Sequence, residues 1–367
     1  MMNKMVVANL AHRPVRSLIS IVAIALEVTL ILLIVGLFIG LMNDSKQRQA
    51  GIGADVVVMP PGSSFIVGLT GSPMSIKVGD VLRKLPHVAV VAPVVQSVST
   101  AGTIEVIAGI DPVTYQELSG PFTYLQGGPM QSDTDCLVDE IYARPHNIKA
   151  GDSIEILNNK FRVAGVIAPG KGARKFLKIN VMQDLIGAQN KATLFYLKAD
   201  NPANADEIVK EIKAVPGMER YVATSMAYYL SMMTTSNYPG LSKVIDAVIG
   251  ISMIIGFMVI FQAMYTAVME RTREIGILKS MGASKFYIVD VIMRETVLLA
   301  IAGIIVGVIV SLAARAAIDG RSTLRVVVTG GWIAKATGIA IIGAVLGALY
   351  PAYQAAQKDP IDALAYE

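Results

Sequence analysis

Four long runs of apolar residues divide the chain. They cover residues 17–42, 241–268, 286–314 and 331–352. A helix that crosses a bilayer needs about 20 apolar residues, so we predict a transmembrane helix at each of the four positions. Glu27 interrupts the first run near its middle. A carboxylate is costly in lipid, so Glu27 is expected to face protein. It is either a lining or proton-linked residue, or it packs against an arginine, a hydroxyl or a second subunit.

Residues 43–240 follow a different pattern, with short β-like runs between Pro- and Gly-rich turns. The predicted strands are residues 54–59, 88–95, 103–110, 153–157, 161–167, 192–197 and 220–223. The predicted helices are residues 78–84, 115–118, 139–144, 181–188 and 203–215. Two strand–helix–strand units therefore flank a β-rich middle. The pattern predicts a membrane protein, α-helical in its four spans, with a split α+β domain carrying an inserted β-rich subdomain between spans one and two.

The segment 269–285, between the second and third spans, has the pattern of a short amphipathic helix. On a period of 3.6 residues, Ile275, Ile277, Leu278 and Met281 fall on one half of the helix surface. Gly282 is expected to end the helix in a left-handed cap. Such an apolar stripe lies on lipid or docks on a partner protein. In the second case Ile275, Leu278 and Met281 supply the apolar contact, and Arg271, Arg273, Glu274 and Lys279 fix its orientation by charge-assisted bonds.

Basic residues set the predicted orientation in the membrane. They precede the first span (Lys4, Arg13, Arg16) and border the segment 269–285 (Arg271, Arg273, Lys279, Lys285, Arg294). The positive-inside rule places both regions in the cytoplasm and the large domain outside. Residues 1–16 then form a cytoplasmic interfacial helix or a frayed N-terminus, 315–330 a short external loop and 353–367 a cytoplasmic tail. Arg315, Arg321 and Arg325 in the external loop are an opposing signal.

Composition supports a membrane protein and excludes several other classes. Hydrophobic residues make up 53% of the 367 residues and charged residues 16%, against about 25% in soluble domains. The net charge of +4 is scattered along the chain, so we expect no nucleic-acid partner. Cys136 is the only cysteine, which excludes an intramolecular disulfide.

Catalytic and metal-binding patterns are not found in the sequence. The three histidines, His12, His87 and His146, are too far apart for a clear zinc pattern, and no serine has a nucleophile-elbow setting. The stretch Gly170–Lys175 has glycines and positive charge but lacks the spacing of a phosphate-binding loop. We interpret it as a basic surface turn and expect no catalysis, metal or cofactor in this chain.

The stretch Met226–Tyr238 leads into the second span and is rich in soft and aromatic side chains: Tyr228, Tyr229, Met232, Met233 and Tyr238. These residue types suit a flat apolar or haem-like ligand. Tyrosine is also enriched at membrane–water interfaces without a ligand, so an aromatic belt is the alternative.

Three stretches resemble the FtsX/MacB-type ABC transporter permeases. Asn9–Leu18 resembles the family's approach to its first span. Glu270–Ser284 is similar to its E-R-x-x-E-I-G-x-L-x-x-x-G-A segment. Tyr350–Leu364 resembles its P-x-x-x-A-x-x-x-D-P-x-x-A-L exit from the last span. The order of spans and domain also agrees.

The resemblance implies a permease homodimer in the bacterial cytoplasmic (inner) membrane, with a porter-like part in its outer domain. Two copies of an ABC ATPase, which hold ATP and Mg, would dock on residues Glu270, Arg271, Arg273, Glu274, Ile275, Leu278, Lys279, Met281 and Gly282. A periplasmic adaptor and membrane lipid are further expected partners.

The chain departs from the MacB pattern because no ATPase domain is fused to it. We expect export or extraction of a hydrophobic or amphipathic substrate such as a drug, peptide, haem or lipid. The alternative is an FtsX-like regulator of an outside enzyme, with no transported substrate.

Overall fold

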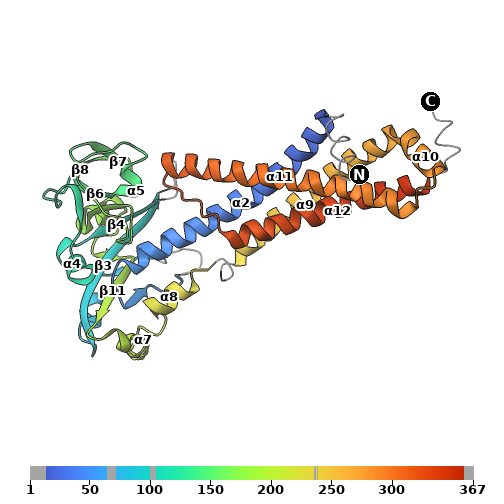
Figure 1. Ribbon diagram of the computed structural model, residues 1–367. Coiled ribbons are helices and arrows are strands. Elements are labelled where there is room, and N and C mark those ends of the chain that lie inside the picture. The colour runs from blue at the N-terminus through green and yellow to red at the C-terminus, as the bar shows by residue number, and fades with distance from the viewer. Residues whose placement is uncertain (1–13, 64–71, 100–104, 235–236, 238, 359–367) are drawn as a thin grey trace. The chain divides into compact units, whose positions relative to one another are not determined.

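The computed structural model describes residues 14–63, 72–99, 105–234, 237 and 239–358. It contains two compact units, each described here by itself. The helix bundle comprises the described parts of residues 1–40, 240–319 and 325–367. The α+β unit comprises those of residues 41–239 and 320–324 (Figure 1).

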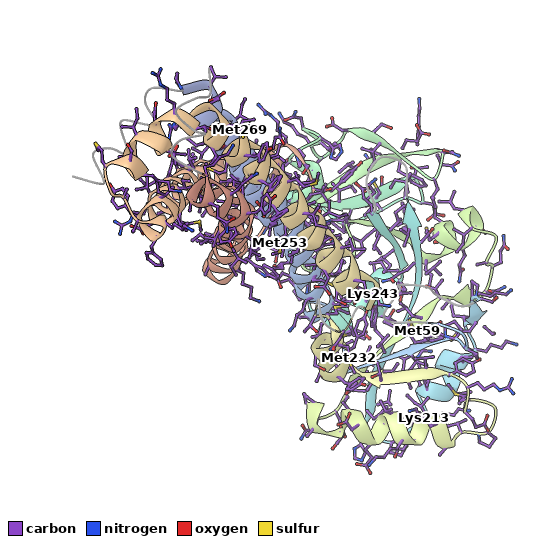
Figure 2. All side chains as sticks on the ribbon, turned by 90° about the vertical axis from the view of Figure 1, so that its right-hand side faces the viewer. Met59, Lys213, Met232, Lys243, Met253 and Met269 are labelled. Atoms are coloured by element: carbon purple, nitrogen blue, oxygen red, sulfur yellow. The ribbon has the colours of Figure 1, made fainter. Side chains whose placement is uncertain are left out.

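Four long helices form the bundle, and each is long and apolar enough to cross a membrane. They are α2 (Pro14–Ala50), α9 (Pro239–Glu270), α11 (Lys285–Arg321) and α12 (Gly330–Gln357). A short helix, α10 (Thr272–Ser280), joins α9 to α11. Figure 2 follows one of the long helices, α9, past Lys243, Met253 and Met269.

Each of the four long helices runs beyond its predicted span, and two of them do so by about two turns at one end. Helix α11 continues past residue 314 to Arg321, and α2 continues past residue 42 to Ala50. In α2 the added turns are polar, and Arg48 Nη1 donates to Asp44 Oδ2 at 2.5 Å from one turn further along the helix. Such a pair supports helix beyond the apolar run, and hydropathy alone does not detect it. The predicted N-terminal helix and most of the predicted C-terminal tail lie outside the described residues.

Glycines allow close contact between the helices. A Cβ at Gly303 would lie 2.7 Å from Ile24 Cβ, and one at Gly307 would lie 2.7 Å from the carbonyl oxygen of Ala25. Only hydrogen at these positions lets α11 approach α2 so closely. Gly338 of α12 differs from these two glycines, because a Cβ there would meet nothing within 4 Å.

Between α11 and α12, an extended segment around Val326 and Val327 lies against α2. Val327 N donates to the carbonyl oxygen of Gly36 at 2.9 Å, and the Val326 side chain is buried. A Cβ at Gly40 would lie 1.8 Å from the carbonyl oxygen of Arg325. Gly36 and Gly40 therefore form a groove, four residues apart on one helix face, that holds the backbone of this segment.

The α+β unit is built on a ten-stranded sheet of order β12-β1-β11-β3-β4-β9-β6-β8-β5, with β7 paired to β8. Its strands are β1 (Val56–Met59), β3 (Val88–Ser99), β4 (Glu105–Ile110), β5 (Tyr124–Gly127), β6 (Asp135–Asp139), β7 (Ser153–Ile156), β8 (Asn159–Ile167), β9 (Lys175–Lys178), β11 (Leu194–Ala199) and β12 (Val222–Ser225). Strands β2 (Met74–Ser75) and β10 (Lys191–Ala192) form a separate pair. The helices are α3 (Val78–Leu82), α4 (Pro112–Ser119), α5 (Glu140–Ala143), α6 (Ile179–Leu185), η1 (Pro202–Asn204), α7 (Ala205–Ala214) and α8 (Met226–Met232).

The two predicted strand–helix–strand units are confirmed, as β1-α3-β3 and β11-α7-β12. Their four strands lie in the order β12-β1-β11-β3, all antiparallel, which is a ferredoxin-like arrangement. Strand β1 shows why the sheet is covered on both faces. Val56 and Val58 belong to the core under α3 and α7, and Val57 to the core that includes α4 and α8.

The β-rich middle of the chain extends the same sheet from β4 onwards. Its core includes Cys136, Phe161 and Leu177. The sequence pattern did not predict β6 and β9, which pair with each other near the centre of this part. Both strands carry charged residues, yet Lys175 is buried because its Nζ lies 2.7 Å from Glu105 Oε2. The prediction that Gly170–Lys175 is a basic surface turn is therefore wrong at Arg174 and Lys175, which are both buried.

Candidate functional site

The short helix α10 begins at a break immediately after α9. The backbone at Arg271 (φ −107°, ψ 15°) leaves the helical conformation, and α10 starts at Thr272. The Thr272 hydroxyl donates back to the carbonyl oxygens of Val268 and Met269 at 3.2 and 2.9 Å. These carbonyls lie at the end of α9, where helical partners run out. The Thr272 hydroxyl therefore supplies a donor to the last carbonyls of α9 at the point where the chain turns into α10.

The end of α10 is a glycine cap, as the sequence predicts. Gly282 has a φ of +96°, and its N–H donates to Lys279 O at 3.0 Å. Ala283 N donates to Leu278 O at 3.0 Å, which completes a Schellman motif. Ser284 Oγ then accepts from Tyr287 N at the first turn of α11. This sequence folds locally as a helix, a left-handed turn and a new helix.

One face of α10 packs into the bundle itself. Ile275 is buried with Val268 of α9, Ile288 of α11 and Ala355 of α12, and Leu278 packs half-buried against this cluster. Ile275 and Leu278 were predicted to supply an outward apolar contact. This is wrong for Ile275, which is buried, and Leu278 exposes only part of its side chain. Periodicity identified the apolar stripe, but the ends of α11 and α12 cover half of it.

Two cationic side chains hold α10 against the neighbouring helices. Arg271 Nη1 donates to Glu295 Oε2 of α11 at 3.0 Å, and both side chains are largely buried. Lys279 Nζ donates to the carbonyl oxygens of Ala356, at 3.0 Å, and of Lys358 at the end of α12. These two residues were predicted to orient a partner, but in this chain they fix the position of α10. Glu295 was not among the predicted site residues. Its position as a carboxylate within the apolar run 286–314 is the feature of the sequence that could have identified it.

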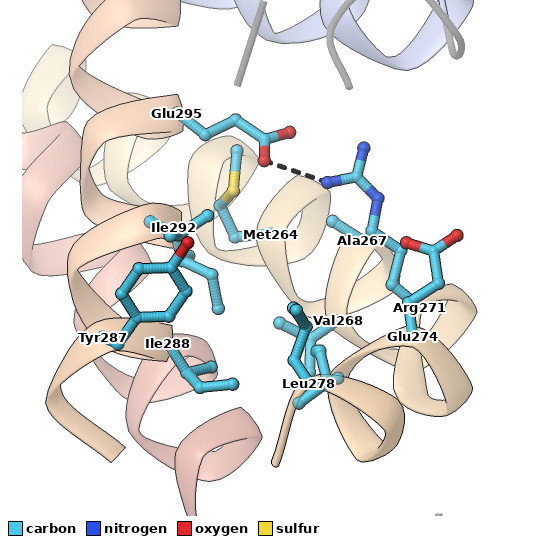
Figure 3. Close-up of a pocket in the computed structure, with 12 residues that line it drawn as sticks. Met264, Ala267, Val268, Arg271, Glu274, Leu278, Tyr287, Ile288, Ile292 and Glu295 are labelled. Carbon is cyan, nitrogen blue, oxygen red and sulfur yellow. Dashed lines mark hydrogen bonds and ion pairs between the residues drawn. The ribbon is translucent and has the colours of Figure 1, made fainter. Parts of the chain in front are cut away.

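The Arg271–Glu295 pair closes one end of a small cavity between α9, α10 and α11 (Figure 3). The cavity has a volume of about 100 Å³ and is lined mainly by apolar side chains, among them Met264, Val268, Leu278, Tyr287 and Ile292. Figure 3 shows the ion pair spanning from α11 to the break before α10.

The opposite face of α10 is exposed. Arg273, Glu274 and Ser280 are exposed, Ile277 is 44% exposed and Met281 73%. Glu274, Ile277 and Met281 follow the i, i+3, i+7 spacing of one helix face. Phe286, in the first turn of α11, is 83% exposed. Of these three exposed apolar residues, Ile277, Met281 and Phe286, only Met281 was among the predicted site residues.

The tyrosine- and methionine-rich stretch does not form a common face. Tyr228 of α8 is exposed, Tyr229 packs on the core of the α+β unit and Met233 is buried. The Met232 sulfur accepts from Asn237 Nδ2 at 3.5 Å, and Tyr238 lies outside the described residues. These side chains divide between solvent and core, so the structure gives no support to a haem-like ligand here.

The intramembrane carboxylate of Glu27 is buried in the bundle against Gly256 of α9. A Cβ at position 256 would lie 2.0 Å from Glu27 Oε2. Neither an arginine nor a hydroxyl is recorded against this carboxylate among the residues that the structure describes.

Known proteins match the chain along most of its length. The model of the MacB-like periplasmic core domain matches residues 17–215, and that of the FtsX-like permease C-terminal region matches residues 247–360. The macrolide export ATP-binding/permease protein MacB of a Shewanella species is 25% identical over 99% of this chain and 60% of its own length. The uncharacterized ABC transporter permease MJ1507 of Methanocaldococcus jannaschii is 24% identical over 97% of this chain and 95% of its own length.

A solved structure also aligns with part of the chain. The periplasmic region of MacB from Actinobacillus actinomycetemcomitans aligns with 50% of this chain and 94% of its own, at a TM-score of 0.39 and 16% identity. The chain thus spans about 60% of the length of the Shewanella relative. Because one family model alone covers residues 17–215 of the 367 and a second covers most of the remainder, the chain belongs to the family of ABC transporter permeases with a MacB-like periplasmic domain and an FtsX-like permease region.

Proposed function

We propose that this chain is the membrane subunit of an ATP-driven exporter, in which a separate ATPase moves the domain outside the membrane. Two ATPase copies, which hold ATP and Mg, and a second permease copy complete the proposed assembly in a bacterial cytoplasmic membrane. A periplasmic adaptor is a further proposed partner. The family membership supports the general function, and α10 supports the site at which the ATPase acts.

The observation that carries this proposal is the exposure of three apolar residues, Ile277, Met281 and Phe286, on or next to α10. The other face of α10 packs against the bundle. Exposed apolar side chains on a short segment fit a hydrophobic groove on a partner. Exposed Arg273 and Glu274 beside them supply charge for orientation. Because Arg271 and Lys279 bind α10 to α11 and α12, a displacement of α10 would be passed to both helices.

The proposed substrate is a hydrophobic or amphipathic molecule, such as a drug, peptide, haem or lipid. The name of the Shewanella relative assigns it macrolide export, which fits this class. Deletion of the gene should then raise sensitivity to at least one such compound. A phenotype restricted to cell-wall cleavage, with no change in export of any of these compounds, would instead favour the FtsX-like regulator.

Co-purification tests the ATPase contact directly. A tagged full-length chain should retain an ABC ATPase, and the double substitution Ile277→Asp with Met281→Asp should reduce the retained ATPase at least tenfold. Val113→Asp is the matched control, because Val113 is an exposed aliphatic residue of the α+β unit. Retention of the ATPase by the double variant at the level of the control would refute docking on this face.

A further inference from the structure

Glu27 is a buried carboxylic acid of the helix bundle. Its side chain is 2% exposed, and Oε1 lacks a hydrogen-bond partner in the described structure. Gly256 of α9 faces the carboxyl group, which occupies the space that a side chain at position 256 would take. The group is therefore enclosed between α2 and α9.

No charged side chain of α9 or α2 stands near the level of this carboxyl group. Between Asp246 and Glu270, α9 contains no Asp, Glu, Lys, Arg or His. These two residues are ten and fourteen positions from Gly256, or about 15 and 21 Å along a helix. In α2 the neighbouring ionisable residues are Arg16, about 16 Å before Glu27 along the helix, and Asp44, about 25 Å after it.

The same holds for the other two long helices. Gly303 and Gly307 of α11 meet α2 at Ile24 and Ala25, level with Glu27. Glu295 and Arg315 are each eight positions from this turn, about 12 Å along the helix. In α12, Gly347 meets α9 at Phe257, and the nearest charged residues, Lys335 and Lys358, are about 18 and 16 Å away along the helix. The ring centroids of Tyr350 and Tyr265 lie 5.9 and 6.1 Å from that of Phe261.

Glu295 provides an internal comparison. It has the same 2% exposure as Glu27, but its carboxylate accepts from Arg271 at 3.0 Å. An ionised carboxylate without such a partner is far more costly in an apolar interior than a neutral acid. The two buried glutamates of the bundle therefore differ in the one contact that stabilises a negative charge.

We propose that Glu27 is a proton-binding site of the bundle. It holds one proton while α2 and α9 are in contact, and it releases that proton to water when the two helices separate. In the chain, α2 precedes the α+β unit and α9 follows it. The protonation state of Glu27 would therefore depend on the contact between the two helices that connect to this unit. This last role rests on the proposed function, whereas the protonation itself does not.

Infrared spectroscopy of the full-length protein in lipid vesicles at neutral pH tests the first step. The difference between wild type and Glu27→Gln should contain the C=O stretch of a protonated carboxylic acid. The difference between wild type and Glu295→Gln should contain carboxylate bands instead. Carboxylate bands in the Glu27→Gln difference would overturn the proposal, whatever the outcome of the ATPase experiments.

A substitution that forces the helices apart tests the second step. Gly256→Leu should convert the Glu27 acid band to carboxylate, because the added side chain displaces α2 and admits water. Gly250→Leu in the same helix is the control, since a Cβ at Gly250 meets nothing within 4 Å. Where Gly256→Leu does not yield a monodisperse protein, Gly256→Ala serves, with a smaller loss of the acid band. An acid band unchanged in a folded Gly256 variant would refute proton release on separation.

Discussion

Arg174 Nη2 donates to Asp44 Oδ1 at 2.7 Å and so joins the last turns of α2 to the sheet of the α+β unit. The same guanidinium donates to Asp139 Oδ2 of β6 at 2.6 Å. Arg48 donates to Asp44 from the next turn of α2, and Tyr196 of β11 donates to Gln49 at 3.1 Å. The end of α2 is thus held by buried polar bonds as well as by apolar packing.

Arg174→Ala should destabilise the α+β unit strongly. Removing one partner of a buried ion pair leaves an uncompensated charge, at a cost of about 3–5 kcal/mol. Arg162→Ala is a suitable control, because its side chain is 60% exposed although it also pairs with a buried aspartate, Asp135. Thermal unfolding of the full-length protein in detergent would measure the loss. Equal effects of the two substitutions would contradict the role given to burial.

The defect of Arg174→Ala should shrink as the pH falls. Burial already raises the pKa of the Asp139 carboxyl, and the Arg174 guanidinium opposes that rise. Without Arg174 the pKa rises further, so acid neutralises the unpaired carboxylate in the folded state before it does so in the unfolded chain. The melting temperatures of wild type and variant should therefore converge below neutral pH. A gap that widens on acidification would show that Asp139 is not the group left unpaired.

Gly40→Ala should loosen the extended segment from α2. The added Cβ would lie 1.8 Å from the Arg325 carbonyl oxygen, and backbone atoms cannot move aside as a flexible side chain can. We expect a loss of roughly 1–3 kcal/mol, as for other overpacked sites. Gly338→Ala in α12 is the control, where a Cβ meets nothing and the better helix former should gain up to about 1 kcal/mol. Equal melting temperatures for the two variants would argue against this groove.

Periodicity and glycine placement were enough to predict the four long helices, the two strand–helix–strand units and the Gly282 cap. These features depend on local patterns and on the burial of one apolar face. Strands β6 and β9 were missed because their charged residues are neutralised by partners far away in sequence, Lys175 by Glu105 and Asp139 by Arg174.

The sequence predicts a short helix where α10 lies, but it does not show which side chains of that helix face solvent. A sequence period identifies the apolar stripe of α10, yet it cannot show that Ala355 of α12, some 80 positions away, covers Ile275. For the same reason Lys279 was predicted to face a partner, although its Nζ donates to the backbone at the end of α12.

The Cys136 thiol should remain unreactive in the folded protein. Burial raises its pKa to about 12, with a smaller opposing effect of Lys175. A thiolate is the reactive form, and almost none is present at neutral pH. A maleimide reagent should label the native protein at least a hundredfold more slowly than the denatured protein. Labelling at similar rates would mean that the core around β6 opens readily.

The Arg271–Glu295 pair should be required to pass motion from α10 to α11. Arg271→Ala and Glu295→Gln each remove the bond, so each should reduce ATP-dependent function while the ATPase stays bound through Ile277 and Met281. A double-mutant cycle should show a coupling of about 1–3 kcal/mol between the two residues in thermal stability. Arg294→Ala is the neighbouring control, since its pair with Asp290 is partly exposed and lies within α11 alone. Loss of ATPase binding in Arg271→Ala equal to that in the Ile277 and Met281 double variant would instead assign Arg271 to the partner contact.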